Sequence, residues 1–221
     1  MKKTGLTLAA VTLLALLPVL QGCVPAAIVG GATVGTMSAL DRRPTLVQTD
    51  DEAIEWKAAQ ALPEPFKATS HVNFTSFNRR LLITGEAPSE EAKAAIGEAA
   101  RKVQGVREVI NELGIGPASS LGSRSTDGYI TSKVKARLVD AKEVSANQVK
   151  VVTERAHVYL MGLLTEQEAK VAVQVARTTT DVRRVINVIE VISPEEAKRL
   201  DLLAKSSEPK PAPAPAPVEN R

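Results

Sequence analysis

The chain has few of the residues from which catalytic, redox and nucleic-acid-binding sites are built. Its 221 residues include one cysteine and two histidines, and aromatic residues make up 3% of the composition. A single cysteine can form neither an intramolecular disulfide nor a cysteine-rich metal site. The net charge of +3 is too small, and the aromatic residues are too few, to suggest a clustered basic surface for nucleic acid.

The sequence motifs of common enzymes are missing as well. The sequence contains no glycine-rich dinucleotide loop, no P-loop and no G-x-S-x-G element. His71 and His157 lie in or near predicted strands, and we expect each to be structural. Carboxylates on the predicted helices alternate with lysine and arginine, as they do on solvated surfaces. We therefore expect a protein that is not an enzyme and has no metal site or cofactor.

The N-terminus has the features of a lipoprotein signal peptide. Two lysines precede an uncharged apolar run from Leu6 to Leu20, which is shorter than the roughly 20 residues of a membrane-spanning helix. The run ends in the letters LQGC, which resemble a bacterial lipobox and place the only cysteine, Cys23, at the lipidation position. We expect residues 1–22 to be removed and Cys23 to carry the lipid anchor.

The residues after Cys23 predict where the anchor holds the protein. Val24 is not the aspartate that retains lipoproteins in the inner membrane of enteric bacteria, so the resemblance implies the outer membrane, with the chain on its periplasmic face. The predicted tether spans residues 23–48, and its residues 24–40 are mostly small, apolar or glycine. Gly31 and Gly35 have the spacing of a membrane-packing helix, but glycine and proline also weaken any helix, which favours a flexible tether.

The rest of the chain contains an internal repeat. The letters VREVIN at 106–111 return as VRRVIN at 182–187, an offset of 76 residues. Two further blocks repeat at nearly the same offset: DEAIEWKAAQAL with DGYITSKVKARL, and LLITGEAPSEEAK with VYLMGLLTEQEAK. In the third block Gly85 matches Gly162. Three blocks at one offset indicate a duplicated module of about 65 residues.

Each copy has the pattern helix, strand, strand, helix, strand. Ile130, Val134 and Leu138 recur every four residues and predict one buried helical stripe. Residues 149–153 and 157–162 alternate as strands do, and a short polar link suggests a hairpin. Thr165 with Glu168 predicts a capping box for the second helix, and Thr49 with Glu52 predicts a similar box for the first helix of copy one. The β-branched run 182–192 predicts the last strand.

The expected fold class is therefore α+β, with two tandem αββαβ modules, at 49–116 and 126–192. In each module a three-stranded mixed sheet should pack against two helices, and the modules should pack together because each buries only a small core. Ser193, Pro194 and Glu196 predict a short helix over 193–205. The proline-alanine run over 206–221 is typical of a disordered tail.

The repeat, its glycines and its GVREVIN and DVRRVIN ends resemble BON domains. With the lipobox and tether, residues 20–192 resemble the dual-BON outer-membrane lipoproteins. That resemblance implies phospholipid binding and support of the cell envelope, which composition and periodicity do not show.

The two copies differ most in their first helix. In copy two, Tyr129, Lys133 and Arg137 are spaced i, i+4, i+8 and share one line of the helix, and Lys135 adds a further cation. An aromatic ring beside cations suits the headgroup zone of a membrane. We expect these four residues to bind anionic phospholipid, although solvated cations beside a packed tyrosine would give the same pattern.

The first helix of copy one is acidic instead. The line equivalent to Tyr129, Lys133 and Arg137 reads Ala53, Lys57 and Ala61. The alternative function is accordingly a non-catalytic adaptor that docks an envelope protein through an exposed sheet edge or through this acidic helix. Its acidic residues are Asp50, Asp51, Glu52 and Glu55.

Overall fold

The computed structural model describes residues 41–206. The predicted signal peptide, the lipidation site Cys23, the tether up to residue 40 and the tail from residue 207 lie outside this range. Within it, no helix is both long enough and apolar enough to cross a bilayer.

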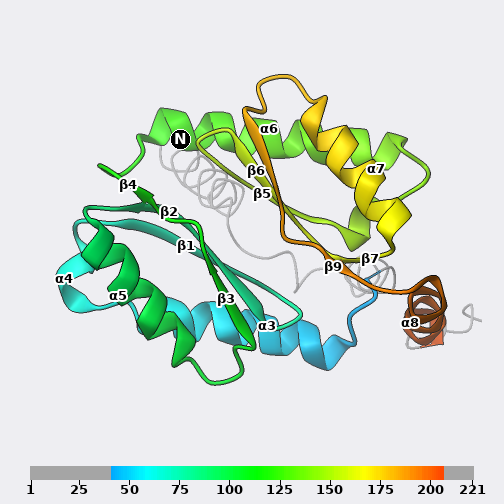
Figure 1. Ribbon diagram of the computed structural model, residues 1–221, viewed down its shortest axis with the longest axis horizontal. Coiled ribbons are helices and arrows are strands. Elements are labelled where there is room, and N and C mark those ends of the chain that lie inside the picture. The colour runs from blue at the N-terminus through cyan, green and yellow to red at the C-terminus, as the bar shows by residue number, and fades with distance from the viewer. Residues whose placement is uncertain (1–40, 207–221) are drawn as a thin grey trace, which may run out of the picture. The chain divides into compact units, whose positions relative to one another are not determined.

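The described chain consists of two copies of one αββαβ arrangement, followed by a helix (Figure 1). Module 1 contains α3 (Thr45–Gln60), α4 (Glu64–Lys67), β1 (His71–Phe77), β2 (Arg80–Ala87), α5 (Glu90–Arg101), β3 (Glu108–Asn111) and β4 (Gly114–Ile115). Module 2 contains α6 (Leu121–Asp140), the 3-10 turn η2 (Ala146–Gln148), β5 (Lys150–Glu154), β6 (His157–Met161), β7 (Leu163–Leu164), α7 (Glu166–Arg177), β8 (Arg184–Asn187) and β9 (Glu190–Val191). The final helix is α8 (Pro194–Ser206).

The two modules share one mixed strand arrangement, which forms a four-stranded sheet in module 1 and a three-stranded and a two-stranded sheet in module 2. In module 1, β1 is antiparallel to β2, and β3 and β4 run parallel to β2. In module 2, β5 is antiparallel to β6, β8 runs parallel to β6, and β9 runs parallel to β7. The predicted α+β class and the duplicated αββαβ order are therefore confirmed. The last strand, expected to be continuous, is divided in both copies, as β3 and β4 and as β8 and β9.

Alternation along the strands produces three apolar clusters. Leu81 and Ile83 of β2 pack beneath α3 and α5, while Leu82 between them points to the opposite face of the sheet. β6 of module 2 alternates in the same way. The opposite-facing residues of the two sheets meet in one cluster: Phe77, Leu82, Tyr159, Met161, Leu163 and Val188. The two sheets therefore pack against each other, with the helices outside them.

The helix starts confirm one expected cap and correct another. Thr165 and Glu168 form a complete capping box at α7. The expected box of Thr49 and Glu52 is wrong, because α3 begins at Thr45, one residue after Pro44. Thr49 lies inside α3, where its hydroxyl donates to the Thr45 carbonyl. The helix therefore takes in the last residues of the segment that we expected to be tether.

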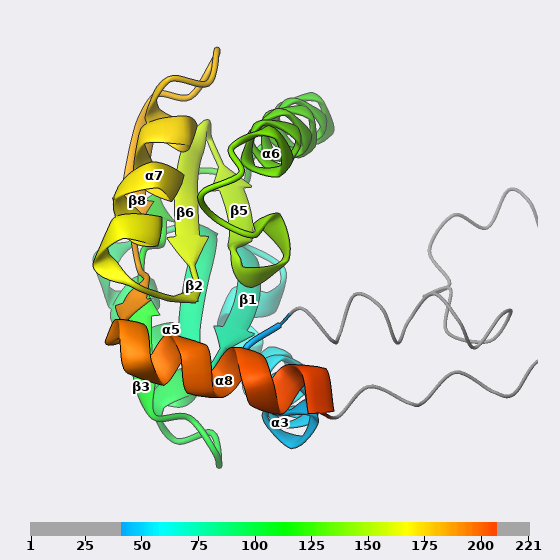
Figure 2. The same ribbon diagram turned by 90° about the vertical axis from the view of Figure 1, so that its right-hand side faces the viewer.

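Arg42 fastens the start of the described chain to module 2. Its guanidinium forms two hydrogen bonds of 2.7 and 2.8 Å with Glu168 of α7, and its Nε lies 2.8 Å from Asp201 of α8. A third contact runs to the Leu163 carbonyl at 2.9 Å. In Figure 2, α8 crosses in front of module 1, close to α3. One buried arginine thus holds together the segment before α3, the start of α7 and the last helix.

Candidate functional site

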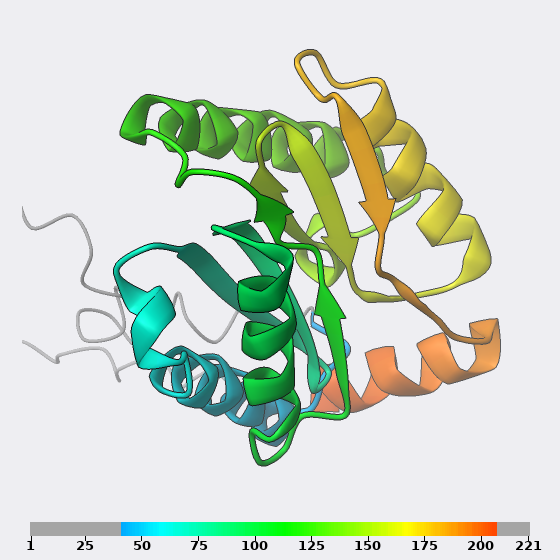
Figure 3. The ribbon, with the colours of Figure 1, turned by 60° about the vertical axis from the view of Figure 1, so that its left-hand side comes forward.

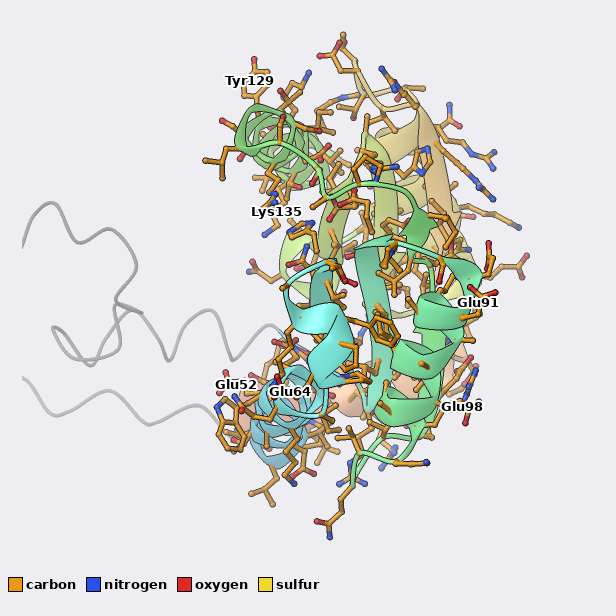
Figure 4. All side chains as sticks on the ribbon, turned by 90° about the vertical axis from the view of Figure 1, so that its left-hand side faces the viewer. Glu52, Glu64, Glu91, Glu98, Tyr129 and Lys135 are labelled. Carbon is orange, nitrogen blue, oxygen red and sulfur yellow. The ribbon has the colours of Figure 1, made fainter. Side chains whose placement is uncertain are left out.

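Helix α6 presents the predicted line of residues on its outer surface. Ile130, Val134 and Leu138 are 0% exposed and pack on the sheet of module 2. Tyr129, next to Ile130 in sequence, is 64% exposed, and its ring points away from module 1 (Figure 4). A large ring with this exposure is available for contact with another surface.

Two cations follow Tyr129 on the same line, and both touch the end of α7. Lys133 lies over the Tyr129 ring, with its ammonium 4.8 Å from the centroid, and forms a 2.5 Å ion pair with Asp181. Arg137 donates to the Val175 carbonyl at 3.0 Å and to the hydroxyls of Thr178 and Thr179. Lys133 is thus partly neutralised, whereas Arg137 contacts only uncharged acceptors.

Lys135 does not join this line. At 100° per residue it lies on the opposite flank of α6 from Lys133 and Arg137. Figure 4 shows Lys135 on the side of α6 nearer to module 1. There it lines a hollow of about 470 Å³ together with Phe77, Val139 and Lys150. The structure therefore brings three of the four predicted lipid-binding residues together and separates the fourth.

Most of the acids on α3 have partners inside the described chain. Asp50 pairs with Arg79 at 2.5 Å. Glu55 accepts from the Ser76 backbone N–H and pairs with Lys150 at 2.8 Å. Asp51 is buried. Since three of the four acids bind internal groups, the acidic helix has little free charge to offer a partner.

Asp51 and Asp127 have a role that sequence reasoning missed. The β1–β2 turn has positive φ at Asn78 and Arg79, and both backbone N–H groups donate to Asp51 at 2.8 and 2.7 Å. In module 2, Arg155 and Ala156 also have positive φ and donate their N–H groups to Asp127 at 2.9 and 2.8 Å. The two aspartates occupy equivalent positions of the repeat, which was the available signal.

Charged groups from both modules meet at a second location. Glu86 of β2 is 0% exposed and accepts from Arg155 at 2.6 Å and from the Ser119 backbone N–H at 2.8 Å. His71 lies 3.3 Å from the same carboxylate. Glu154, also buried, accepts from Asn73 through one oxygen, while its Oε1 has no hydrogen-bond partner in the described part of the chain. This cluster joins the two modules through buried charge.

Within residues 41–206, one group of side chains has the ligand types and spacing to hold a metal ion. It consists of His71, Glu86 and Glu154, whose ligand atoms lie within 4.8 Å of one another. Arg155 already pairs with Glu86, so a bound cation would meet a neighbouring positive charge. The sequence did not predict this grouping, because the three residues come from three different strands.

Glu154 makes the stability of the fold depend on pH. Burial and then the nearby Glu86 carboxylate raise its pKa. A carboxyl group whose pKa is higher in the folded than in the unfolded chain destabilises the fold as pH rises through the interval between the two pKa values. We expect Glu154→Gln to raise the free energy of unfolding by about 1 kcal/mol at pH 7.5. The gain should shrink as pH falls and vanish at about pH 3, below both pKa values, where the carboxyl is protonated in both states.

Urea denaturation at the two pH values measures this difference. Glu143→Gln is the matched control, since Glu143 is an exposed carboxylate of the same module and should change stability by no more than about 0.5 kcal/mol. A loss of stability in Glu154→Gln at pH 7.5 would show that the ionised carboxylate supports the junction.

Similarity to known proteins identifies the family of this chain. The BON domain family matches residues 50–117 and 126–193. The outer membrane lipoprotein DolP of Haemophilus influenzae is 37% identical over 175 residues, which cover 78% of this chain and 90% of that protein. A 21 kDa hemolysin of Actinobacillus pleuropneumoniae is 34% identical over 155 residues, covering 69% of this chain and 80% of that protein.

Solved structures show a weaker likeness. CdsD, a structural protein of the type III secretion system of Chlamydia trachomatis, aligns at 17% identity with a TM-score of 0.27, covering 69% of this chain and 68% of that chain.

Proposed function

This chain belongs to the BON domain family, and from that premise we propose that it is an outer-membrane lipoprotein whose module 2 binds anionic phospholipid and which supports the integrity of the envelope. Cys23 would carry the anchor and leave residues 24–221 on the periplasmic face. The name of the Haemophilus relative supports the location. Mass spectrometry of the mature N-terminus tests the anchor, and an unmodified Cys23 would refute it.

The observation that carries lipid binding is the exposed line on α6. Tyr129 is exposed beside a fully buried stripe, and Lys133 lies against its ring. A ring of this kind can enter the headgroup zone, while the cations beside it meet phosphates. Each cation contributes at most ~1 kcal/mol near an anionic surface, but an anchored domain already has a high effective concentration at the membrane.

A protein-binding adaptor is the second candidate, and Trp56 is the observation in its favour. Trp56 lies on α3 and is 67% exposed. Exposed tryptophans are frequent anchors of protein interfaces. The paired acids of the same helix weaken the earlier idea of an acidic docking surface. If the protein is an adaptor and does not bind lipid, module 2 should bind neither neutral nor anionic vesicles.

We expect Tyr129→Ala and Lys133→Glu each to weaken binding to phosphatidylglycerol vesicles by roughly 5-fold or more. The tyrosine effect should depend little on salt because it reflects apolar insertion, whereas the lysine effect should shrink at high salt. Vesicle co-sedimentation of residues 24–221, which include all of the described residues 41–206, measures both effects without the anchor.

Lys57→Glu in module 1 is the matched control, because Lys57 is equivalent to Lys133 but has no neighbouring aromatic ring on its line. The thermal midpoint of each variant monitors folding. Arg137 is exposed, as predicted, and both Arg137 and Lys133 also bind the end of α7 or the loop that follows it, so the folding control applies to a charge reversal at either position. Wild-type protein that binds neutral and anionic vesicles equally would count against the proposal.

A further inference from the structure

The one differing letter between VREVIN and VRRVIN changes the charge of a surface. Glu108 in module 1 becomes Arg184 in module 2. Glu108 binds Arg80 at 2.6 Å, and this pair neutralises the start of β3. The equivalent start of β8 has an arginine where module 1 has the acid.

The neighbouring arginines of the two modules also differ in whether they are paired with carboxylates. In module 1, Arg101 pairs with Glu98 at 2.5 Å, and Arg107 pairs with Glu190. Their equivalents in module 2 are Arg177 and Arg183. Neither these two nor Arg184 has a carboxylate partner within residues 41–206.

The three arginines of module 2 surround a hollow. Arg177, Arg183 and Arg184 line a depression of about 370 Å³ together with Val182 and Val185. All three are exposed. The one acid in the loop between α7 and β8 is Asp181, and it is already paired with Lys133. The depression is therefore cationic without an internal counter-charge.

The charge of these arginines affects the pKa of the neighbouring residue His157. His157 is the register partner of Arg184 on β6. Its own desolvation, followed by the charges of Arg184, Arg183 and Arg155, lowers the pKa of His157. The arginines therefore disfavour the charged form of the imidazole at this edge of the sheet.

The hollow adjoins the α6 line. Lys133 binds the Thr180 carbonyl and Asp181, and Arg137 binds Thr178 and Thr179. Both contacts hold the α7–β8 loop against α6, and Figure 3 shows this loop projecting beyond the ends of the strands of module 2. The α6 line is thus connected to the hollow through residues 178–181, which lie between Arg177 and Arg183 in sequence.

We propose that the hollow between Arg177, Arg183 and Arg184 is a phosphate-binding site that takes the headgroup phosphate of an anionic phospholipid. Guanidinium groups bind phosphate oxygens through paired hydrogen bonds, and this hollow is lined by three arginines that have no carboxylate partner in the described part of the chain. This inference rests on the proposed function, since it names the part of the lipid that module 2 recognises. A free phosphate ester presents the same chemistry, so the test separates the two sources.

The test compares equivalent arginines of the two modules. Arg177→Glu and Arg184→Glu, made separately in residues 24–221, should each lower affinity for phosphatidylglycerol vesicles by at least about 5-fold. Arg101→Glu should change it less than about 2-fold, because Arg101 occupies the position of Arg177 in module 1 and is already paired. Arg184→Glu restores the letter of module 1, and thermal midpoints confirm that each variant folds.

The outcomes separate this inference from the proposed function. If Lys133→Glu and Tyr129→Ala abolish vesicle binding while Arg177→Glu and Arg184→Glu leave it unchanged, lipid binding stands and the hollow is not the phosphate site. If wild-type protein binds no vesicles, the proposed function fails. NMR titration with inorganic phosphate then tests the hollow itself. Chemical-shift changes confined to the amides of residues 177–185 would support a site for soluble phosphate esters. The absence of such changes would refute the proposed phosphate site.

Discussion

Replacing Gly85 with alanine should destabilise the protein by more than about 3 kcal/mol. Gly85 has φ +110°, a backbone conformation that side chains rarely adopt, and an added Cβ would lie 2.0 Å from the carbonyl oxygen of His71. Gly85 is paired with Val72 across β1 and β2, so the clash cannot be relieved by turning a side chain. The strands would have to separate, next to the buried Glu86.

Chemical denaturation of the full mature chain measures this loss. Gly162→Ala should destabilise module 2 less, since its Cβ would lie 2.6 Å from the Gln148 carbonyl oxygen and its φ is not in the left-handed region. Gly128→Ala is the control: it lies inside α6 with no atom within 4 Å of the added Cβ, and it should stabilise by about 0.5–1 kcal/mol. Equal effects at Gly85 and Gly128 would contradict the argument.

The second large effect is expected at Asp51. Its carboxylate is 2% exposed and accepts four hydrogen bonds, from the Ser76 hydroxyl, the backbone N–H groups of Asn78 and Arg79, and the Arg43 guanidinium. Asp51→Asn keeps the shape but replaces one acceptor oxygen with a donor that faces other donors. The loss should be about 3–4 kcal/mol, because buried donors are left unpaired and Arg43 loses a partner.

Asp50→Asn provides the control for this substitution. Asp50 is the preceding residue, is about half exposed and has a single ion pair with Arg79, so the change should stay within about 1 kcal/mol. Asp127→Asn in module 2 should fall between the two, since Asp127 holds the equivalent turn through two backbone donors. If Asp51→Asn were as mild as Asp50→Asn, the turn would not depend on the buried carboxylate.

The internal repeat marked the positions of Gly85 and Asp51 in the sequence, but it did not show their structural roles. The repeat aligned Gly85 with Gly162 and placed Asp51 opposite Asp127. Position in a repeat shows that two residues are equivalent, but it does not show that both aspartates are buried. From the sequence we expect Asp51 to belong to a solvated acidic surface, whereas in the structure it is buried and accepts hydrogen bonds from the backbone of the β1–β2 turn.

The sequence by itself determined the duplication, the αββαβ order and the buried stripe of α6. These follow from local rules: a period near four residues for a helix, a period of two for strands, and a cap such as Thr165 with Glu168. The exposure of Tyr129 followed too, because the buried stripe beside it fixes which side of α6 faces the core.

Only the tertiary structure decided which charges are free. Helical periodicity separates Lys135 from Lys133, but the partners of Lys133, which are the Tyr129 ring and Asp181, come from the folded structure. Ion pairs form between residues that the chain brings together over long separations, as Arg42 does with Glu168 and Asp201. For the same reason Arg184 could be seen to differ from Glu108 in the sequence, but its lack of a counter-charge became visible only when the loops, strands and helices around it were in place.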